Sequence, residues 1–221
     1  QSMLTDPILE PGSTDDWFRD IERAFGNLFG SDGGRYRAHA ADKVRVRAPD
    51  ASPPFAALIH ESNPDSGAYG GMSFVIFPAR PALENDPDYD GAPALFGMVL
   101  GTQGLSPDEK ILGRPGHARK CNAIAEWLNA EFGRGGDGRS AWAKRDPVRL
   151  DQSVPGNVQS EFPDFQPVFD KYGDEIYAMF APPSESDTGD QTREATDHAL
   201  KAFLDLMFEE RGEEPLKAAR D

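Results

Sequence analysis

The chain lacks several features that would assign it to a known class of site. Its 221 residues include one cysteine, Cys121, which excludes an intramolecular disulfide. Its four histidines are scattered along the chain and show no zinc-ligand spacing. The longest apolar runs, such as residues 94–100, fall far short of the roughly 20 residues that span a bilayer. We therefore expect a soluble, cytoplasmic protein with no metal site and no membrane partner.

Catalytic and nucleotide-binding motifs are also missing. The chain contains no G-x-x-x-x-G-K-[ST], no H-E-x-x-H and no G-x-S-x-G. GRGGDG at 133–138 fits the dinucleotide pattern but follows a predicted helix, whereas that motif must follow a strand. DPDYDG at 86–91 begins like a calcium loop, but its twelfth position is Gly97 instead of glutamate. We expect no cofactor and no catalytic residues, so any nucleotide hydrolysis would reside in another domain or subunit.

Positive charge is scarce and concentrated. The chain has 23 Lys and Arg against 38 Asp and Glu, a net charge of -15. The first basic segment, residues 35–47, holds five Lys or Arg and one Asp, and the second, residues 110–149, holds nine and four acids. One interpretation is a basic face on an acidic body, which suits a polyanionic ligand. The other is that these cations are solvated or pair with acids that folding brings near.

Hydrophobic periodicity predicts one α+β domain over residues 4–212, with a mainly antiparallel, twisted sheet of about 4–5 strands and about three packed helices. The expected helices lie within residues 13–34, 115–133 and 190–212. The expected strands cover residues 43–49, 54–61, 72–78, 94–101 and 174–182, the first four forming an antiparallel meander. Residues 133–163 are expected to be mostly loop. Residues 1–3 are interpreted as a tag remnant and residues 213–221 as an acidic tail or linker leading to further domains.

The start of the second predicted helix carries an unusual charge pattern. Arg114 precedes it, and His117, Arg119 and Lys120 occupy its first turns. A helix N-terminus has partial positive charge and favours acids, so cations there indicate a docked anion. The alternative is that long basic side chains extend into solvent.

One family resemblance covers about a third of the chain. The stretches VRVRAP, PPFAALIHESNPDSGAYGGMSFVIFP and ALFGMVLGTQGLSPDE, between residues 44 and 109, resemble the N-terminal DNA-recognition domain of McrB-type, modified-cytosine-dependent restriction proteins. That resemblance implies a non-catalytic domain that flips a methylated cytosine into an aromatic-lined pocket, while a GTPase module and a separate nuclease act on the DNA. Tyr69 would correspond to a pocket aromatic, and Pro54 stands where the family has Trp.

These observations favour a DNA-recognition domain of a McrB-like restriction or phage-defence protein, acting with a P-loop ATPase or GTPase domain and a nuclease subunit. Tyr69 would contact a flipped, modified base, and basic side chains would hold DNA phosphates. The expected DNA-binding residues are Arg45, Arg47, Tyr69, Arg114, His117, Arg119 and Lys120. Two alternatives remain: a protein-interaction or regulatory module of a larger ATPase or GTPase, and a small-anion-binding enzyme that uses His117 as acid or base.

Overall fold

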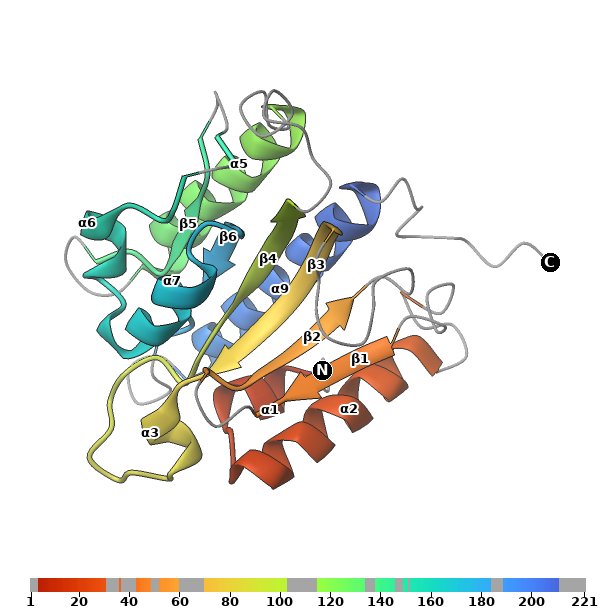
Figure 1. Ribbon diagram of the computed structural model, residues 1–221. Coiled ribbons are helices and arrows are strands. Elements are labelled where there is room, and N and C mark those ends of the chain that lie inside the picture. The colour runs from red at the N-terminus through yellow and green to blue at the C-terminus, as the bar shows by residue number, and fades with distance from the viewer. Residues whose placement is uncertain are drawn as a thin grey trace.

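A computed structural model describes most of the chain as one sheet covered by helices on both faces (Figure 1). The described residues are 4–30, 36, 43–48, 52–59, 70–102, 115–133, 138–145, 149–150, 152–183 and 189–210. Residues 1–3 and 213–221, interpreted above as a tag remnant and a tail, lie outside these ranges.

The sheet has six strands in the order β1-β2-β3-β4-β6-β5, and every neighbouring pair is antiparallel. The strands are β1 (Lys43–Arg47), β2 (Phe55–Ile59), β3 (Gly70–Pro78), β4 (Ala94–Thr102), β5 (Ala141–Ala143) and β6 (Ile176–Phe180). The helices are α1 (Thr5–Leu9), α2 (Thr14–Gly30), α3 (Arg80–Leu83), α5 (Pro115–Phe132), α6 (Gly156–Gln159), α7 (Gln166–Tyr172) and α9 (Asp190–Glu210), with a 3-10 helix η2 (Pro163–Phe165). The predicted α+β class and the meander β1-β2-β3-β4 are confirmed, but the described residues form more strands and helices than predicted.

Alternation along the strands divides the core into two layers. On one face, Phe74, Phe96 and Phe180 are buried in neighbouring strands beneath α1, α2, α5 and α9. The ring of Phe96 lies 5.9 Å from that of Phe74 and 5.4 Å from that of Phe180, centroid to centroid. On the other face, α6, η2 and α7 bury Val158 and Phe165 against the sheet. Because each face has its own helical cover, the central strands are apolar on both sides.

The three long helices follow the predicted apolar spacing. The inward side chains of α2 and α9 are buried as expected, because residues three and four apart share one helix face. These are Trp17, Ile21 and Phe25 in α2 and Leu200, Phe203, Leu204 and Met207 in α9. In α5, Cys121 and Leu128 are buried, whereas Ile124 and Phe132 are partly buried against the same core.

Gly97 permits the close pairing of β4 with β6. A Cβ atom at this position would overlap the carbonyl oxygen of Ala178 and lie 2.7 Å from Cα of Met179. The register of the two strands shifts immediately afterwards, between Met98 and Val99. The glycine is therefore required by backbone approach, as is common beside a bulge.

Most of the described residues in 133–163 lie outside helices and strands, as predicted, but two short elements that were not predicted, β5 and α6, lie among them. η2 and α7 follow directly and were not predicted either. These elements have three to seven residues, too few to establish a periodic pattern in the sequence. Their existence depends on tertiary burial of side chains such as Phe162 and Phe165. Among the described residues, no helix combines the length and the apolar character needed to cross a bilayer.

Candidate nucleic-acid interface

The first basic segment contributes β1, which forms one edge of the sheet. Val44 and Val46 pack against the core beneath α2, as the alternating sequence predicts. Arg45 pairs with Ala57 and Arg47 pairs with Phe55, so both arginines lie on the opposite face of the strand. The predicted strand with one basic face is confirmed.

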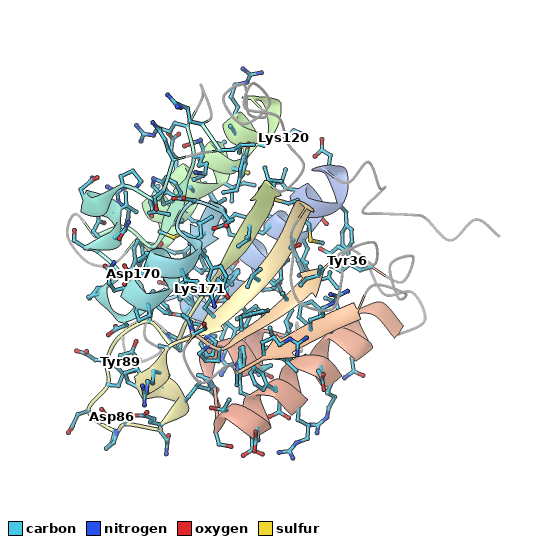
Figure 2. The ribbon with its side chains drawn as sticks, viewed as in Figure 1. Tyr36, Asp86, Tyr89, Lys120, Asp170 and Lys171 are labelled. Carbon is cyan, nitrogen blue, oxygen red and sulfur yellow. The ribbon has the colours of Figure 1, made fainter. Side chains whose placement is uncertain are left out.

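The second basic segment begins at α5, where the described cations are exposed. Arg119 and Lys120 are both on the outer surface, whereas Ala118 and Cys121 face the core. Lys120 forms an ion pair with Glu209 of α9, and Figure 2 labels Lys120 at this end of the molecule. An exposed pair of this kind contributes under about 1 kcal/mol. Lys120 therefore pairs with an acid that folding brings near, which was one of the two interpretations of the basic segments.

Three of the predicted site residues cannot be positioned. Tyr69 and Arg114 lie outside the described residues, and the side chain of His117 is not described although its backbone belongs to α5. The predicted base contact of Tyr69 and the acid-base role of His117 therefore stay predictions.

The described cations of β1 and α5 do not form one basic face. β1 and β5 are the two edges of the sheet, and five strand spacings separate them by about 24 Å. α5 packs beside β5 and buries Cys121 in the core on the face opposite Arg45. Arg45 and Arg47 thus lie on one face of one edge, and Arg119 and Lys120 lie over the other face toward the other edge.

The pairing register shows which residues of the second basic segment lie on the same face of the sheet as β1's arginines. One row of paired residues crosses all six strands: Arg45, Ala57, Val75, Gly97, Met179 and Trp142. Laterally paired residues share a face, so Trp142 lies on the same face as Arg45 at the opposite edge. Sheet twist of about 20–25° per strand turns the two ends of this row roughly 100° apart. They therefore belong to separate surfaces.

Trp142 lines a cavity of about 460 Å³ beside α6, which we call the β5 cavity. Four of its lining residues are cations, and the described lining contains no Asp or Glu. The lining residues are Arg139, Trp142, Ala143, Lys144, Arg145, Arg149, Gln152, Ser153, Pro155, Asn157 and Val158. In a chain of net charge -15, this is a local reversal of sign.

Lys144 forms a buried, positively charged part of this lining, with 5% of its surface exposed. Its ammonium group donates to the carbonyl oxygen of Arg149 at 3.3 Å and to that of Gln152. Its backbone N–H donates to the carbonyl of Tyr177 in β6 at 2.9 Å. Lys144 therefore ties the segment around residues 149–152 to the sheet, and its charge lies in a region that water does not screen fully.

Arg139 is held by Glu161. Its Nε lies 2.8 Å from a carboxylate oxygen of Glu161, and its backbone N–H donates to the same side chain at 3.2 Å. Glu161 offsets one of the four cations, while the Arg145 and Arg149 side chains belong to exposed residues. A guanidinium has five N–H donors, so an Nε contact leaves four for other acceptors.

Two asparagines of α5 fix the position of β5. Asn129 accepts hydrogen bonds from the backbone N–H groups of Ser140 at 2.8 Å and Ala141 at 2.9 Å, and donates to the Ala141 carbonyl at 2.9 Å. Asn122 donates to the carbonyl oxygen of Lys144 at 2.5 Å. The outer edge of β5 is therefore paired with side chains of α5, which positions Trp142 and Lys144.

Glu175 is a half-buried acid on the turn before β6. Burial raises the pKa of its carboxyl above the usual range, the neighbouring Asp174 raises it further, and the charge of Lys144 lowers it. The burial effect is the largest, so folding shifts the protonation equilibrium of Glu175 toward the neutral form relative to the unfolded chain.

The acidic stretch at 86–91 is organised by internal hydrogen bonds. The Tyr89 hydroxyl donates to the carbonyl of Ala92 at 2.7 Å and contacts Asp164 at 3.1 Å, and Asp86 accepts from the Asp88 N–H at 3.0 Å. Figure 2 labels Asp86 and Tyr89 in this loop. Within the described part of the chain, no three His, Cys, Asp or Glu side chains gather as a metal site would require.

Sequence reasoning missed the residues of the β5 cavity. Arg139, Lys144, Arg145 and Arg149 are counted in the second basic segment, but the expectation of a loop gave no reason to group them with Trp142. The signal that could have identified these residues was the density of positive charge in the second basic segment. The chain matches no protein-family model, no curated protein and no solved structure, so its own sequence and geometry carry the functional assignment.

Proposed function

We propose that this chain is a non-catalytic DNA-recognition domain of a McrB-like restriction or defence protein. The observation that carries the proposal is the presence of four cations around one cavity at the β5 edge of the sheet, with two more cations on the neighbouring helix α5, in an acidic chain. The cavity cations are Arg139, Lys144, Arg145 and Arg149, and those of α5 are Arg119 and Lys120. A local concentration of cations is the electrostatic footprint of a phosphate-backbone contact.

The local geometry supports treating these cations as one group. The hydrogen bond from Asn122 to the Lys144 carbonyl joins the first turns of α5 to the end of β5. Arg119 lies one helical turn before Asn122, and Arg145 directly follows Lys144. Helix α5 and the end of β5 therefore present their cations from adjacent elements.

The resemblance to McrB-type domains supplies the finer part of the proposal. The strands of that family correspond to the confirmed meander β1-β2-β3-β4, with Arg45 and Arg47 on the face of the edge strand opposite Val44 and Val46. In this proposal Arg45 and Arg47 make a second, separate phosphate contact, and a modified base is read after it leaves the duplex. A P-loop ATPase or GTPase domain and a nuclease subunit act on the bound DNA.

The test is binding of fluorescent duplex DNA, with and without 5-methylcytosine, at about 50 mM and about 200 mM salt. Arg145→Ala with Arg149→Ala is expected to weaken binding at least about tenfold and to lower the salt slope by about 2. Arg80→Ala is the matched control, because Arg80 is an exposed arginine of α3 that pairs with the nearby Glu84. Absence of binding to either duplex at the lower salt would refute the function.

One observation favours the protein-interaction module as a second candidate. Trp127 on α5 is 40% exposed, and its ring lies 5.5 Å from that of Phe132 and 5.6 Å from that of His198. Exposed aromatic residues are enriched in protein interfaces. An interaction module would ignore DNA at low salt, and its partner binding would survive loss of Arg145 and Arg149 but not Trp127→Ala.

A further inference from the structure

We propose that the β5 cavity binds a single nucleotide, with its phosphate on Arg145 and Arg149 and its base against Trp142. This site goes beyond DNA-backbone contact, because the recognised unit is one phosphate joined to one planar ring. Such a unit is present both in a free mononucleotide and in a nucleotide of a strand. The experiment below separates these two sources.

The charge of the lining selects an anion. Four cations line the cavity, and no Asp or Glu is among its described lining residues. Two other cavities of the described structure have the opposite character. A cavity of about 290 Å³ is lined by Asp6, Glu10 and Asp20 with one arginine, and a cavity of about 430 Å³ is lined by Glu10 and Asp86 without a cation. Anion selectivity therefore belongs to the β5 cavity and is not a general property of this surface.

The donors present suit a phosphate in particular. A guanidinium binds two phosphate oxygens at once through parallel N–H groups, and this geometry favours phosphate over a spherical anion. Arg145 and Arg149 supply two such groups, and the buried ammonium of Lys144 adds a fixed charge. Gln152, Ser153 and Asn157 supply the neutral donors and acceptors that sugar hydroxyls and base edges need.

Trp142 supplies the surface for a planar ring. Its side chain is partly buried against the apolar layer beneath α6 and also lines the cavity. Pro155 and Val158 contribute further apolar surface to the same lining. Stacking on an aromatic side chain tolerates every base, because each base has a π face. The cavity therefore combines an aromatic wall with a cationic one.

The walls are held in place before any ligand binds. Val154 N–H donates to the Gly173 carbonyl at 3.1 Å, and Gln159 donates to the Val154 carbonyl at 2.7 Å. Gly173 lies so close that a Cβ there would overlap the Ser153 hydroxyl. With β5 fixed by Asn129, the site is preorganised, which reduces the entropy cost of binding.

The size of the cavity limits the ligand. A volume of about 460 Å³ lies in the lower half of the roughly 300–1,000 Å³ range of small-molecule sites. A cavity of this volume can hold one nucleotide, but a longer oligonucleotide cannot enter it as a whole.

Trp142 itself can report binding. The chain has three tryptophans, of which Trp17 is buried with 1% exposure and Trp127 is exposed. In a Trp127→Phe background, quenching by added dCMP or dAMP would therefore come from Trp142. Saturable quenching is expected, with deoxycytidine and inorganic phosphate each binding at least about tenfold more weakly, because each lacks one half of the recognised unit.

Two variants and one control test the assignment. Arg145→Ala with Arg149→Ala is expected to weaken dCMP binding at least about tenfold. Arg80→Ala is expected to bind as the parent does, since Arg80 lies on α3. Trp142→Leu, followed by calorimetry, is expected to abolish the preference for dCMP over inorganic phosphate while phosphate binding persists. Circular dichroism and thermal melts establish that each variant is folded.

The outcomes separate this site from the proposed function. Lack of saturation by mononucleotides at about 5 mM, or equal binding by the arginine double variant and the Arg80→Ala control, would overturn the nucleotide site. If dCMP and a short single strand compete, the cavity accepts a nucleotide both as a free molecule and as part of a strand. If dCMP binds and the strand does not, the ligand is a free mononucleotide. Strand binding without dCMP binding overturns the cavity site but leaves DNA recognition intact. Binding of dCMP without duplex binding refutes DNA recognition and leaves the cavity site intact.

Discussion

Replacing Asn129 by alanine tests how the candidate site is built. The Asn129 side chain makes hydrogen bonds of 2.8–2.9 Å to the backbone N–H groups of Ser140 and Ala141 and to the Ala141 carbonyl. Alanine removes all of these partners at once. β5 would then lose the pairing of its outer edge, because β6 is its only neighbouring strand within the described sheet.

The magnitude follows from the number of bonds. Each hydrogen bond contributes about 1 kcal/mol net, and a buried group left unpaired costs about 1–3 kcal/mol. Asn129 is half-buried, so water replaces part of the loss, and we expect the free energy of unfolding to fall by about 3 kcal/mol. For a domain of this length that corresponds to a fall of about 6–12 °C in Tm.

Urea unfolding measures the stability, and amide hydrogen exchange measures the local effect. The amides of Ser140 and Ala141 are expected to exchange faster in the variant, while those of β3 change less. Asn27→Ala is the matched control, since Asn27 is an exposed asparagine of α2. A loss below about 1 kcal/mol, with unchanged exchange at Ala141, would show that β5 is held by other contacts.

Three further predictions concern the core and the turn before β6. Gly97→Ala is expected to lower the free energy of unfolding by about 3 kcal/mol or more, because the new Cβ overlaps backbone of β6; a change under about 1 kcal/mol in urea unfolding would contradict this. Phe96→Ala is expected to cost about 3–5 kcal/mol, while Phe96→Leu costs clearly less; equal losses would exclude cavity formation as the cause. Because the pKa of Glu175 is raised on folding, its neutral form stabilises the protein at low pH, and that contribution is lost as pH rises from about 4.5 through the folded pKa. Glu175→Gln is expected to raise stability at pH 7 and to flatten this part of the pH profile; an unchanged profile between pH 4 and 8 would refute the assignment.

The local sequence pattern was sufficient to predict the long helices and the strand β1. Helices α2, α5 and α9 have apolar residues at three- and four-residue spacing over 17–21 residues, and β1 alternates Val44 and Val46 with basic residues. Such patterns are properties of consecutive residues, so they can be recognised without the fold. β5 offered no such pattern, since Ala141–Ala143 is a strand through its pairing with β6 and the contacts of Asn129.

Composition and periodicity were enough to predict the class of the fold, the order of the meander and the presence of two basic segments in an acidic chain. Which cations lie near one another, in contrast, depends on how the strands and helices pack. Strand order puts β1 and β5 at opposite edges, so Arg45 and Arg119 are separated, whereas Arg139, Lys144, Arg145 and Arg149 gather around Trp142. The physical reason is that periodicity assigns a residue to a face of its own element, but pairing register and helix packing decide where that face lies.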